Sequence, residues 1–388
     1  MPDPGNRKRH ILVFSALFPP AFLGGGPIKT LDSMLRAAPS SVTVSVLTAD
    51  RDLNETTRLP VVSNEWEAKD FGRVRFVSSE KIGELAKAWW SSRKPSPGVV
   101  YLNGFFNAKY SIFPHMLARL GFWGRIHVLL APRGEFSPGA LEIKASKKSL
   151  FIRLFKLSGA PTRTIWHAST VEEADHIRAV MGDRSTVLIR ENETSLPARA
   201  TPALGNQRDT LHMVFLSRVS PKKGLDVLLA ALRNVSQPVT LDIYGPEEDV
   251  AYSARCHQIA ESLPDHVLCR FKGPVPVAQV RETFAQYDLF VLPTAGENFG
   301  HVIAESLSVS CPVMCADTTP WSRLLAAGGG VVVPERSPLE WGRAIEAYAL
   351  RGRSGWLEMR QSSTGAYDSW RAASKGPHIF EQLSQHLA

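Results

Sequence analysis

The chain has 388 residues, about twice the length of a typical single domain, so two domains with separate cores are expected. Hydrophobic residues make up 44% and charged residues 21%, a balance that excludes a disordered protein, and the apolar runs are too short to span a bilayer. The net charge of +8 is uneven, because residues 101–170 hold ten bases and two acids. The basic excess of the N-terminal half indicates an anionic partner. This partner would be a phosphorylated substrate, a lipid surface or nucleic acid.

The N-terminus, MPDPGNRKRHILVFSALFPP, is similar to a signal peptide in having a basic stretch before an apolar one. Pro19 and Pro20 cut the apolar run short, so a buried first strand is the favoured interpretation, and a cytoplasmic protein is expected. The cysteines show no zinc-ligand spacing, and we expect them to be reduced and mostly structural. They are Cys256, Cys269, Cys311 and Cys315.

Apolar, strand-like runs alternate with helix-like segments along most of the chain. In the first half the expected strands are 10–16, 43–48, 73–77, 98–102, 126–130, 163–167 and 185–189. In the second half they are 212–218, 239–244, 267–271, 288–293, 312–316 and 330–333, with amphipathic stretches at 224–235 and 276–286. This alternation predicts an α/β protein with parallel sheets covered by helices on both faces.

Residues 194–210, TSLPARATPALGNQRDT, are rich in Pro, Ala and Thr and lack periodicity, so they are the best linker in the chain. We therefore expect two doubly wound, Rossmann-like domains, 1–200 and 201–365, that face each other across a cleft. The tail, 366–388, ends in the helix-like HIFEQLSQHL and is expected to pack back on the first domain. Ligands of such sheets bind beyond the carboxyl ends of the strands.

The segment FLSRVSPKKGLDVLL, 215–229, carries two cations where a strand gives way to a helix. Arg218 follows the strand, and Lys223 with Gly224 opens the helix. Two cations and free helix N–H groups at one strand end suit a diphosphate. As an isolated pair, both cations also fit the simpler interpretation of solvated surface residues.

The segment GENFGHVIAES, 296–306, places two acids eight positions apart around a glycine loop. Gly300 allows close approach of the backbone, and the amides after it begin a helix. Glu305 suits the helix dipole in the first turns, which gives it a structural explanation. Glu297 precedes the helix in a loop and has no structural need for its charge, so it is expected to accept hydrogen bonds from sugar hydroxyls.

Together these segments resemble the family 4 (group 1) retaining glycosyltransferases of the GT-B fold. The residues that carry the resemblance are Arg218 with Lys223-Gly224, the strand 267–275 (VLCRFKGPV), the pair Glu297 and Glu305, and SVSCPVMCADTTPW after them. In the first half, SALFPPAFLGGGPIKTLDSML is similar to the family's glycine loop, and APRGEFSPGAL to its Pro-His-Gly or Pro-Arg-Gly segment. The resemblance covers nearly the whole chain.

The resemblance implies that the first domain binds the acceptor and the second a nucleotide-diphosphate sugar, UDP- or GDP-linked. Arg218 and Lys223 would bind the diphosphate and stabilise its growing charge. Glu297 would hold the donor sugar together with the amides of Asn298, Phe299 and Gly300. The remaining donor contacts would come from Glu305 to the ribose, the backbone near Lys272 and Val275 to the base, and Gly25 and Gly26 to the phosphates on domain closure.

Arg133 departs from the family pattern, because many members have a histidine between the flanking Pro132 and Gly134. A fixed cation replaces a neutral imidazole there, so Arg133 is a catalytic candidate that would bind an acceptor phosphate or a donor oxygen. Asn103, Glu135 and His167 are the acceptor-binding candidates, although His167 also fits a purely structural role. No metal, cofactor or protein nucleophile is expected, since the two cations neutralise the diphosphate.

Two basic, apolar stretches, 140–157 and 87–94, suggest an anionic membrane surface as a further partner. The lysines from Lys144 to Lys148 overlie the apolar arc of 150–157, so a buried helix with a basic first turn fits nearly as well. Our hypothesis is a peripheral enzyme with a glycan or lipid-linked acceptor, in cell-surface polysaccharide or lipopolysaccharide synthesis. The rivals are an epimerase or phosphorylase of the same fold, a non-catalytic sugar-nucleotide sensor, and a basic nucleic-acid-binding protein, which no recognition motif supports.

Overall fold

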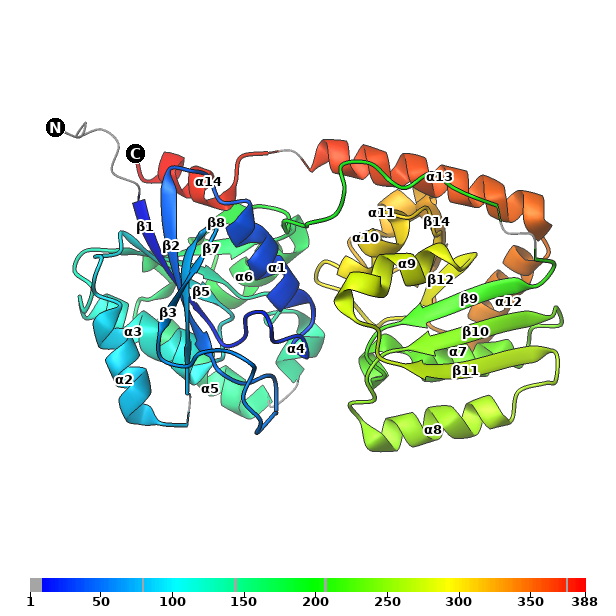
Figure 1. Cartoon of the computed structure of the whole chain (residues 1–388), viewed down its shortest axis with the longest axis horizontal. Helices are drawn as coiled ribbons and strands as arrows, with labels where there is room; N and C mark the ends of the chain where they lie inside the picture. Colours follow the sequence, from blue (N-terminus) through cyan, green and yellow to red (C-terminus); the bar gives the residue numbers. More distant parts are fainter. Residues whose placement is uncertain (1–8, 79, 143–144, 206–207, 375) are drawn as a thin grey trace. The chain divides into compact units, whose positions relative to one another are not determined.

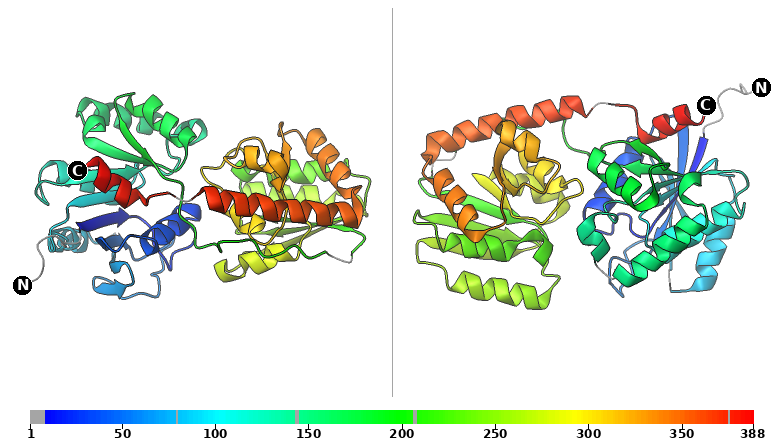
Figure 2. Two further views of the ribbon diagram at one scale, coloured as in Figure 1. Left: turned by 90° about the horizontal axis from the view of Figure 1, so that it is seen from above. Right: turned by 180° about the vertical axis from the view of Figure 1, so that it is seen from behind.

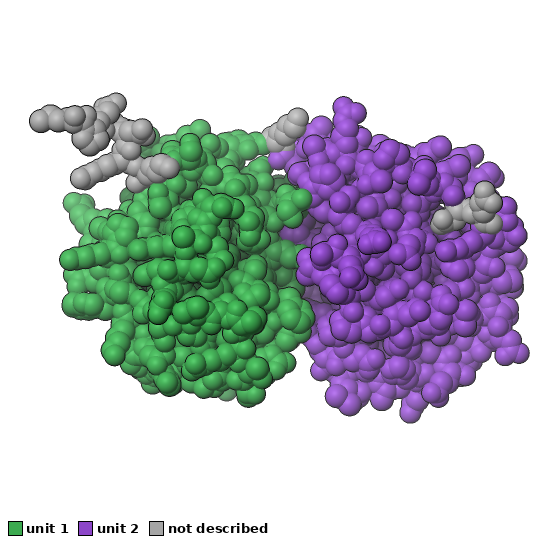
Figure 3. Space-filling model, viewed as in Figure 1, with its two compact units in different colours: residues 1–195, 376–388 green, residues 196–375 purple. Residues whose placement is uncertain are grey.

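The computed structural model describes residues 9–78, 80–142, 145–205, 208–374 and 376–388. The chain divides into two compact units (Figure 3): unit 1 is Met1–Ser195 with Gly376–Ala388, and unit 2 is Leu196–Lys375. The chain therefore passes from one unit to the other twice. The first crossing falls within the linker expected at 194–210.

Unit 1 is built on an eight-stranded sheet with the order β3-β4-β2-β1-β5-β6-β7-β8, in which every neighbouring pair is parallel except β3 with β4 (Figure 1). Its strands are β1 (Arg9–Ser15), β2 (Val42–Ala49), β3 (Trp66–Lys69), β4 (Gly72–Val77), β5 (Val99–Asn103), β6 (His127–Ala131), β7 (Thr164–Ala168) and β8 (Thr186–Ile189). The seven strands expected in this half are all present. Only β3 was missed, because it is short and none of its residues is fully buried.

Successive residues of β1 belong to different cores, as the two-residue period of a strand requires. Ile11 and Val13 lie in a core with α1 (Gly26–Arg36) and α14 (Ile379–His386). Leu12 and Phe14 lie in a core on the other face. The helices that contribute to that second core are α2 (Ile82–Ser91), α3 (Phe113–Arg119), α5 (Ala145–Leu157) and α6 (Val171–Met181).

Unit 2 has a six-stranded, fully parallel sheet with the order β11-β10-β9-β12-β13-β14. Its strands are β9 (Leu211–Leu216), β10 (Val239–Tyr244), β11 (Val267–Gly273), β12 (Leu289–Leu292), β13 (Val313–Ala316) and β14 (Gly330–Val333). Consecutive residues of β9 from Met213 to Phe215 are fully buried, so both faces of this sheet are covered. Both halves thus have the doubly wound α/β architecture expected from the sequence.

The helices of unit 2 form two groups, and the helices within each group pack against one another (Figures 1 and 2). One contains α7 (Leu225–Leu232), α8 (Val250–Glu261) and α12 (Pro338–Ala349), and the other contains α9 (Val280–Ala285), α10 (His301–Leu307) and α13 (Gly352–Ala373). Helix α13 runs through residues 366–373, so that part of the expected tail continues a helix of unit 2. Only the segment from Gly376 onward belongs to unit 1.

The cysteines are unpaired thiols, three of them buried. Burial raises the pKa of Cys256 and Cys311 to about 11 and that of Cys269 and Cys315 to about 12, so all four are neutral thiols at pH 7. Within the described part of the chain, no helix combines the length and the apolar character needed to cross a bilayer.

The C-terminal helix α14 is part of the core of unit 1. Ile379, Phe380 and Leu383 are almost completely buried there, and the ring of Phe380 lies edge-on to that of Tyr101 in β5. The imidazole of His378 is hydrogen-bonded to the carbonyl oxygen of Met34 at 2.9 Å, which joins the start of α14 to α1.

We predict that Phe380→Ala lowers the free energy of unfolding of the full chain by about 3–5 kcal/mol, because it leaves a cavity in the core of unit 1. Gln385→Ala, on the exposed side of the same helix, is the matched control. Urea unfolding followed by circular dichroism measures both. Equal unfolding midpoints for the two variants would contradict the assignment of α14 to this core.

Candidate functional site

Two loops of unit 2, following the adjacent strands β9 and β12, are bound to each other at the carboxyl edge of the sheet. The amide of Ala295 donates to the carbonyl oxygen of Lys222 at 2.7 Å. Gly224 has φ 73°, and a Cβ there would lie 2.3 Å from the carbonyl oxygen of Pro293. Glycine is therefore required at 224 both by its conformation and by the close approach of the second loop.

Lys223 and Glu297 form an ion pair between these loops. The distance from Nζ of Lys223 to Oε1 of Glu297 is 2.5 Å, and each side chain is 11% exposed. The hydroxyl of Thr294 donates to the same carboxylate oxygen at 3.0 Å. The expectation that Glu297 has no structural need for its charge was wrong, because its carboxylate neutralises a largely buried lysine.

Arg218 lies in the turn after β9 and is 41% exposed. Its guanidinium pairs with Glu248 at 3.0 Å, on the loop after β10. Gly245 places these two loops close together: a Cβ on it would lie 1.8 Å from the carbonyl oxygen of Ser217. Both contacts with Glu248 come from Nη1, so this acid positions Arg218 at the strand edge without contacting Nε or Nη2.

The cations in the loop after β9 repel one another electrostatically. Desolvation lowers the pKa of Lys222, and the positive charges of Lys223 and Arg218 lower it further, against the opposing effect of Glu297. Three cations therefore lie close to one another, with Glu297 as a carboxylate among them. A local excess of positive charge of this kind favours an anionic ligand.

The turn into α10 combines a left-handed glycine with a packed aromatic side chain. Gly300 has φ 82° and precedes the first residue of the helix. The side chain of Phe299 is 4% exposed and packs against Trp321, whose indole N–H donates to the carbonyl oxygen of Phe299. The side chain of Phe299 therefore anchors the loop and is not available to a ligand.

Glu305 lies in the middle of α10 and is 8% exposed. The sequence placed it in the first turns of a helix, where the dipole would explain its charge. Helix α10 begins at His301 as expected, and Glu305 is its fifth residue, in the second turn, where the helix dipole acts less strongly than in the first. Of the other donor candidates, Asn298 is half-buried, Lys272 is exposed in β11, and Val275 packs partly against the core just after β11.

In unit 1, Arg133 follows β6 and has φ 56°, a left-handed conformation that is uncommon for a residue with a side chain. Its guanidinium donates to Asn103 Oδ1 at 2.9 Å, Asn192 Oδ1 at 2.7 Å and Tyr101 Oη at 2.7 Å. All three acceptors are neutral. They position the cation without neutralising it.

A hydrogen-bonded chain fixes the tautomer of His167. Tyr101 Oη lies 3.0 Å from Nδ1 of His167, and Nε2 lies 3.2 Å from the carbonyl oxygen of Arg190. A carbonyl only accepts, so Nε2 carries the proton and Nδ1 accepts from Tyr101. Burial raises the pKa of Tyr101 to about 12, and burial together with the cation of Arg133 lowers the pKa of His167 well below its usual value.

The two nitrogens of His167 are therefore both used inside unit 1, which favours the structural role left open by the sequence. Glu135 is also engaged, because its carboxylate accepts from the amides of Phe105 at 2.5 Å and Phe106 at 3.1 Å. Burial raises the pKa of Glu135, and these two amides partly offset that effect. Asn103 thus contacts Arg133 directly, and His167 is linked to Arg133 through Tyr101. Glu135 instead orders a neighbouring loop.

Two carboxylates that position this region were missed from the sequence. Glu173 accepts from the amide of Gly134 at 2.6 Å and from the amide and hydroxyl of Ser169 at 2.7 Å each. Asp52 accepts from the amides of Phe22 at 2.8 Å and Leu23 at 3.2 Å. For Glu173 the only sequence signal is its spacing from Thr170, which is typical of a helix start. That spacing predicts a helix cap and not the contact with the loop at Gly134.

Asp52 thereby holds the glycine loop that precedes α1. Gly25 has φ 66° and precedes α1, and Gly26 is the first residue of the helix. A Cβ on Gly25 would meet no other atom within 4 Å. The glycine is thus needed for the turn itself and leaves open space beside the backbone.

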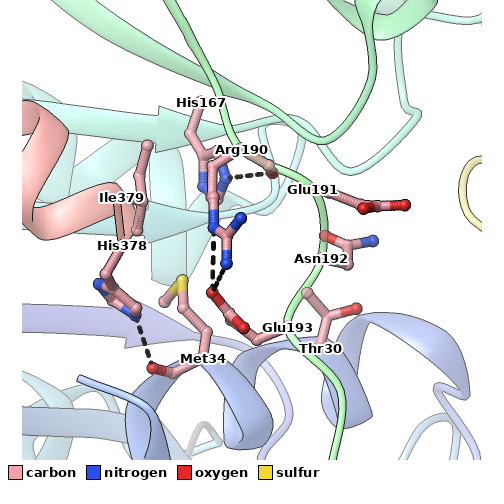
Figure 4. A pocket seen from close by; sticks show the side chains of 9 residues that line it. All are labelled: Thr30, Met34, His167, Arg190, Glu191, Asn192, Glu193, His378 and Ile379. Carbon is pink, nitrogen blue, oxygen red and sulfur yellow. Dashed lines mark hydrogen bonds and ion pairs between the residues drawn. The ribbon is translucent and has the colours of Figure 1, made fainter. Parts of the chain in front are cut away.

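A small pocket in unit 1 lies next to this network (Figure 4). His167 and Arg190 border it. The guanidinium of Arg190 donates to Oε1 of Glu193 at 3.0 Å from Nε and at 2.5 Å from Nη2. The residues that line it are Thr30, Met34, His167, Arg190, Glu191, Asn192, Glu193, His378 and Ile379. All of its lining residues belong to unit 1. Among the described residues, no cluster of three or more acidic, His or Cys side chains is arranged to hold a metal ion.

The fold and the edge loops of unit 2 define the class of protein. Residues 200–361 match the family model described as glycosyl transferases group 1. The crystal structure of HepE from Anabaena, in complex with UDP and glucose, is similar over 98% of this chain and 99% of its own, with a TM-score of 0.72 at 15% identity. The two parallel α/β sheets are those of GT-B glycosyltransferases. Over residues 200–361 the chain is thus similar to the group 1 glycosyl transferases, and its two sheets have the GT-B fold.

Among curated relatives, a D-inositol 3-phosphate glycosyltransferase of Streptomyces bingchenggensis is 27% identical over 235 residues. The match covers 56% of this chain and about half, 50%, of that relative. The apo form of the lipopolysaccharide outer core galactosyltransferase WaaB is similar in fold over 96% of this chain and 99% of its own, with a TM-score of 0.58 and 14% identity.

We predict that Lys223 and Glu297 contribute to the stability of unit 2 as a coupled pair and not independently. Lys223→Met or Glu297→Gln alone is expected to lower the free energy of unfolding by about 2–4 kcal/mol, because each leaves an unpaired group with little access to water. The double variant is expected to recover at least about 1 kcal/mol relative to the sum of the single changes. Urea unfolding of all four proteins measures this coupling, and strictly additive losses would contradict it.

We predict that His167 contributes to acid sensitivity. Its pKa is depressed in the folded chain, so below about pH 6.5 the unfolded state binds a proton that the folded state does not, and stability falls as the pH decreases. His167→Gln, which stays uncharged, is expected to make this dependence shallower by up to about 1.4 kcal/mol per pH unit. Urea unfolding between about pH 5 and 7.5 tests this.

His386→Gln, at an exposed position of α14, is the matched control. If His167→Gln has the same slope of stability against pH as the unchanged protein, then the pKa of His167 is not depressed in the folded chain and the residue does not contribute to acid sensitivity.

Proposed function

We propose that the chain transfers a sugar from a nucleotide-diphosphate sugar to a glycan or lipid-linked acceptor, with retention of configuration. The observation that carries this proposal is the Lys223–Glu297 pair between two glycine-containing loops at the sheet edge of unit 2. It places a cation, a carboxylate and open backbone where doubly wound sheets bind ligands. The UDP and glucose bound by HepE support a UDP-linked hexose as the donor class.

The donor diphosphate is assigned to Arg218 and Lys223. A lysine has three N–H donors, and Glu297 takes one of those of Lys223, which leaves donors for phosphate oxygens. Arg218 exchanges its exposed partner Glu248 for the diphosphate, an exchange with little cost because solvent already screens the pair. Glu305 is assigned to the ribose, Glu297 to the donor sugar, and the backbone near Lys272 and Val275 to the base.

In the proposed reaction the bond between the anomeric carbon and the diphosphate oxygen breaks. The acceptor hydroxyl forms its new bond on the same face, and its proton passes to the departing phosphate oxygen. Arg218 and Lys223 stabilise the negative charge that grows on the diphosphate as it leaves. All atoms and charges balance without a covalent enzyme intermediate.

Arg133 is assigned to an anionic group of the acceptor. Three of its five N–H groups donate to Asn103, Asn192 and Tyr101, and within the described chain these acceptors are uncharged. A cation positioned in this way by neutral groups suits a phosphate. The D-inositol 3-phosphate glycosyltransferases act, by their names, on a phosphorylated acceptor, which supports this assignment. Synthesis of a cell-surface polysaccharide or lipopolysaccharide at the inner face of the membrane fits the similarity to WaaB.

We predict that a nucleoside diphosphate stabilises the chain against heat. Saturation at about 100 times Kd would add about 2.7 kcal/mol to the free energy of unfolding. Thermal shift measurements with UDP, GDP, ADP and their sugars identify the base. Lys223→Met and Arg218→Ala are expected to reduce the shift strongly, because each removes a cation from the diphosphate.

Arg343→Ala, which removes an exposed arginine of α12, is the matched control and is expected to keep the full shift. Stabilisation by none of these nucleotides would overturn the proposed function. An equal shift in Lys223→Met and in the unchanged protein would overturn the role of Lys223 alone.

A further inference from the structure

Helices α2, α3 and α5 cover the same face of the sheet of unit 1, and each has an inner and an outer side. On the inner side, Leu85 and Ala88 of α2, Ala118 of α3 and Phe155 of α5 lie in one core. The outer sides, with Leu120 directly after α3, carry eight large apolar residues that are more than half exposed. We call this outer surface the three-helix face.

On α5, Leu150, Leu154 and Leu157 form one exposed stripe, since residues four and three apart share a side of a helix. Arg153 and Lys147 lie on either side of that stripe and are exposed as well. The sequence left open whether 140–157 is an interfacial helix or a buried helix with a basic first turn. Lys144 lies outside the described residues, and Lys148 turns inward to the carbonyl oxygen of Ala140 at 2.5 Å.

A second stripe runs along α3, where Phe113, Met116 and Leu120 are more than half exposed. It was not expected from the sequence. The two helices are neighbours, because the imidazole of His115 lies 4.9 Å from the ring of Phe155 on their inner sides. A guanidinium N–H of Arg119 also donates to Ser158 Oγ at 3.1 Å.

Helix α2 extends the surface with an aromatic residue. Trp90 is exposed, and the guanidinium of Arg93 lies over its ring, 4.6 Å from the centroid. The adjacent Trp89 stacks on Phe113 of α3 with ring centroids 6.0 Å apart. The apolar residues of α2 and α3 are therefore continuous across the two helices.

The charge of this region is almost entirely positive. The segments 81–94, 108–125 and 145–163 together contain twelve lysines and arginines and one acid, Glu84. Exposed apolar residues surrounded by cations match the interface of an anionic bilayer, where apolar side chains enter the headgroup region and cations face the lipid phosphates. Tryptophan is favoured at the same level.

Other partners fit this surface less well. A second copy of the chain would bring two surfaces of the same sign together, which opposes association. Nucleic acid would use the cations but leave two stripes of leucine, methionine and phenylalanine without a role, because its binding is dominated by phosphate contacts. An acidic protein would use both features, and the test below separates it from lipid.

We propose that the three-helix face docks unit 1 on an anionic lipid bilayer. This inference deepens the proposed function, because it specifies how the chain reaches a lipid-linked acceptor. It does not depend on the transfer chemistry. The docking residues all belong to unit 1, and the donor residues belong to unit 2.

The test is flotation of the full-length protein with vesicles of phosphatidylcholine containing about 30% phosphatidylglycerol, against vesicles of phosphatidylcholine alone. The anionic vesicles are expected to bind at least about tenfold more protein, and raising the salt from about 0.1 to 0.5 M is expected to weaken binding. The triple variant Leu150→Ser, Leu154→Ser, Leu157→Ser is expected to lose most of this binding. Arg153→Glu with Lys156→Glu is expected to have the same effect.

The matched control is the triple variant Val250→Ser, Leu339→Ser, Leu350→Ser, which removes exposed apolar residues from unit 2 and is expected to bind as before. Melting temperature and the UDP-induced thermal shift show that each variant is folded. No binding to anionic vesicles, or equal binding by both triple variants, would overturn the proposal. A UDP-induced shift of the melting temperature without vesicle binding would contradict the docking surface alone and leave the proposed transferase function unaffected.

Discussion

The ion pair between Lys223 and Glu297 is the constraint on which the donor half of the site depends. Its two residues are far apart in sequence, and they meet because β9 and β12 are adjacent parallel strands whose carboxyl ends reach the same edge. An ion pair with so little exposure gains little stability by itself, since removing both charges from water costs about as much as their attraction returns. The surrounding loops therefore have to hold it, and Gly224 and Ala295 provide the close backbone approach. The result is a cation that is oriented before any ligand arrives.

The fold was largely predictable because the strands of a doubly wound sheet are apolar on both faces. Runs such as VTLDIY at 239–244 and GVVV at 330–333 stand out from the amphipathic helices around them. β3 at Trp66–Lys69 gave no such signal, since it lies at the sheet edge with no fully buried residue. The extent of α13 also escaped prediction, because its polar sequence carries few apolar anchors and its end is set by the return of the chain to unit 1.

Local sequence patterns located the candidate loops, whereas contacts between distant loops left no signal in the sequence. Arg218, Lys223 and Gly300 were located from local patterns at strand and helix ends. The pairing of Glu297 with Lys223 was missed, since nothing in either segment specifies the other. Asp52 was missed for the same reason: a carboxylate that accepts from the amides of Phe22 and Leu23 leaves no spacing signal, because the segments meet only after the sheet has formed.

The net charge of +8 separates into two physically different sets of cations. Lys223 and Arg133 are each held by specific side chains, which restricts their side-chain freedom. Arg153 and Lys156 are exposed beside apolar stripes and keep that freedom, which suits a surface of mobile headgroups rather than one bound molecule. Composition alone indicated an anionic partner. We propose a bound anion for the first set and an anionic bilayer for the second.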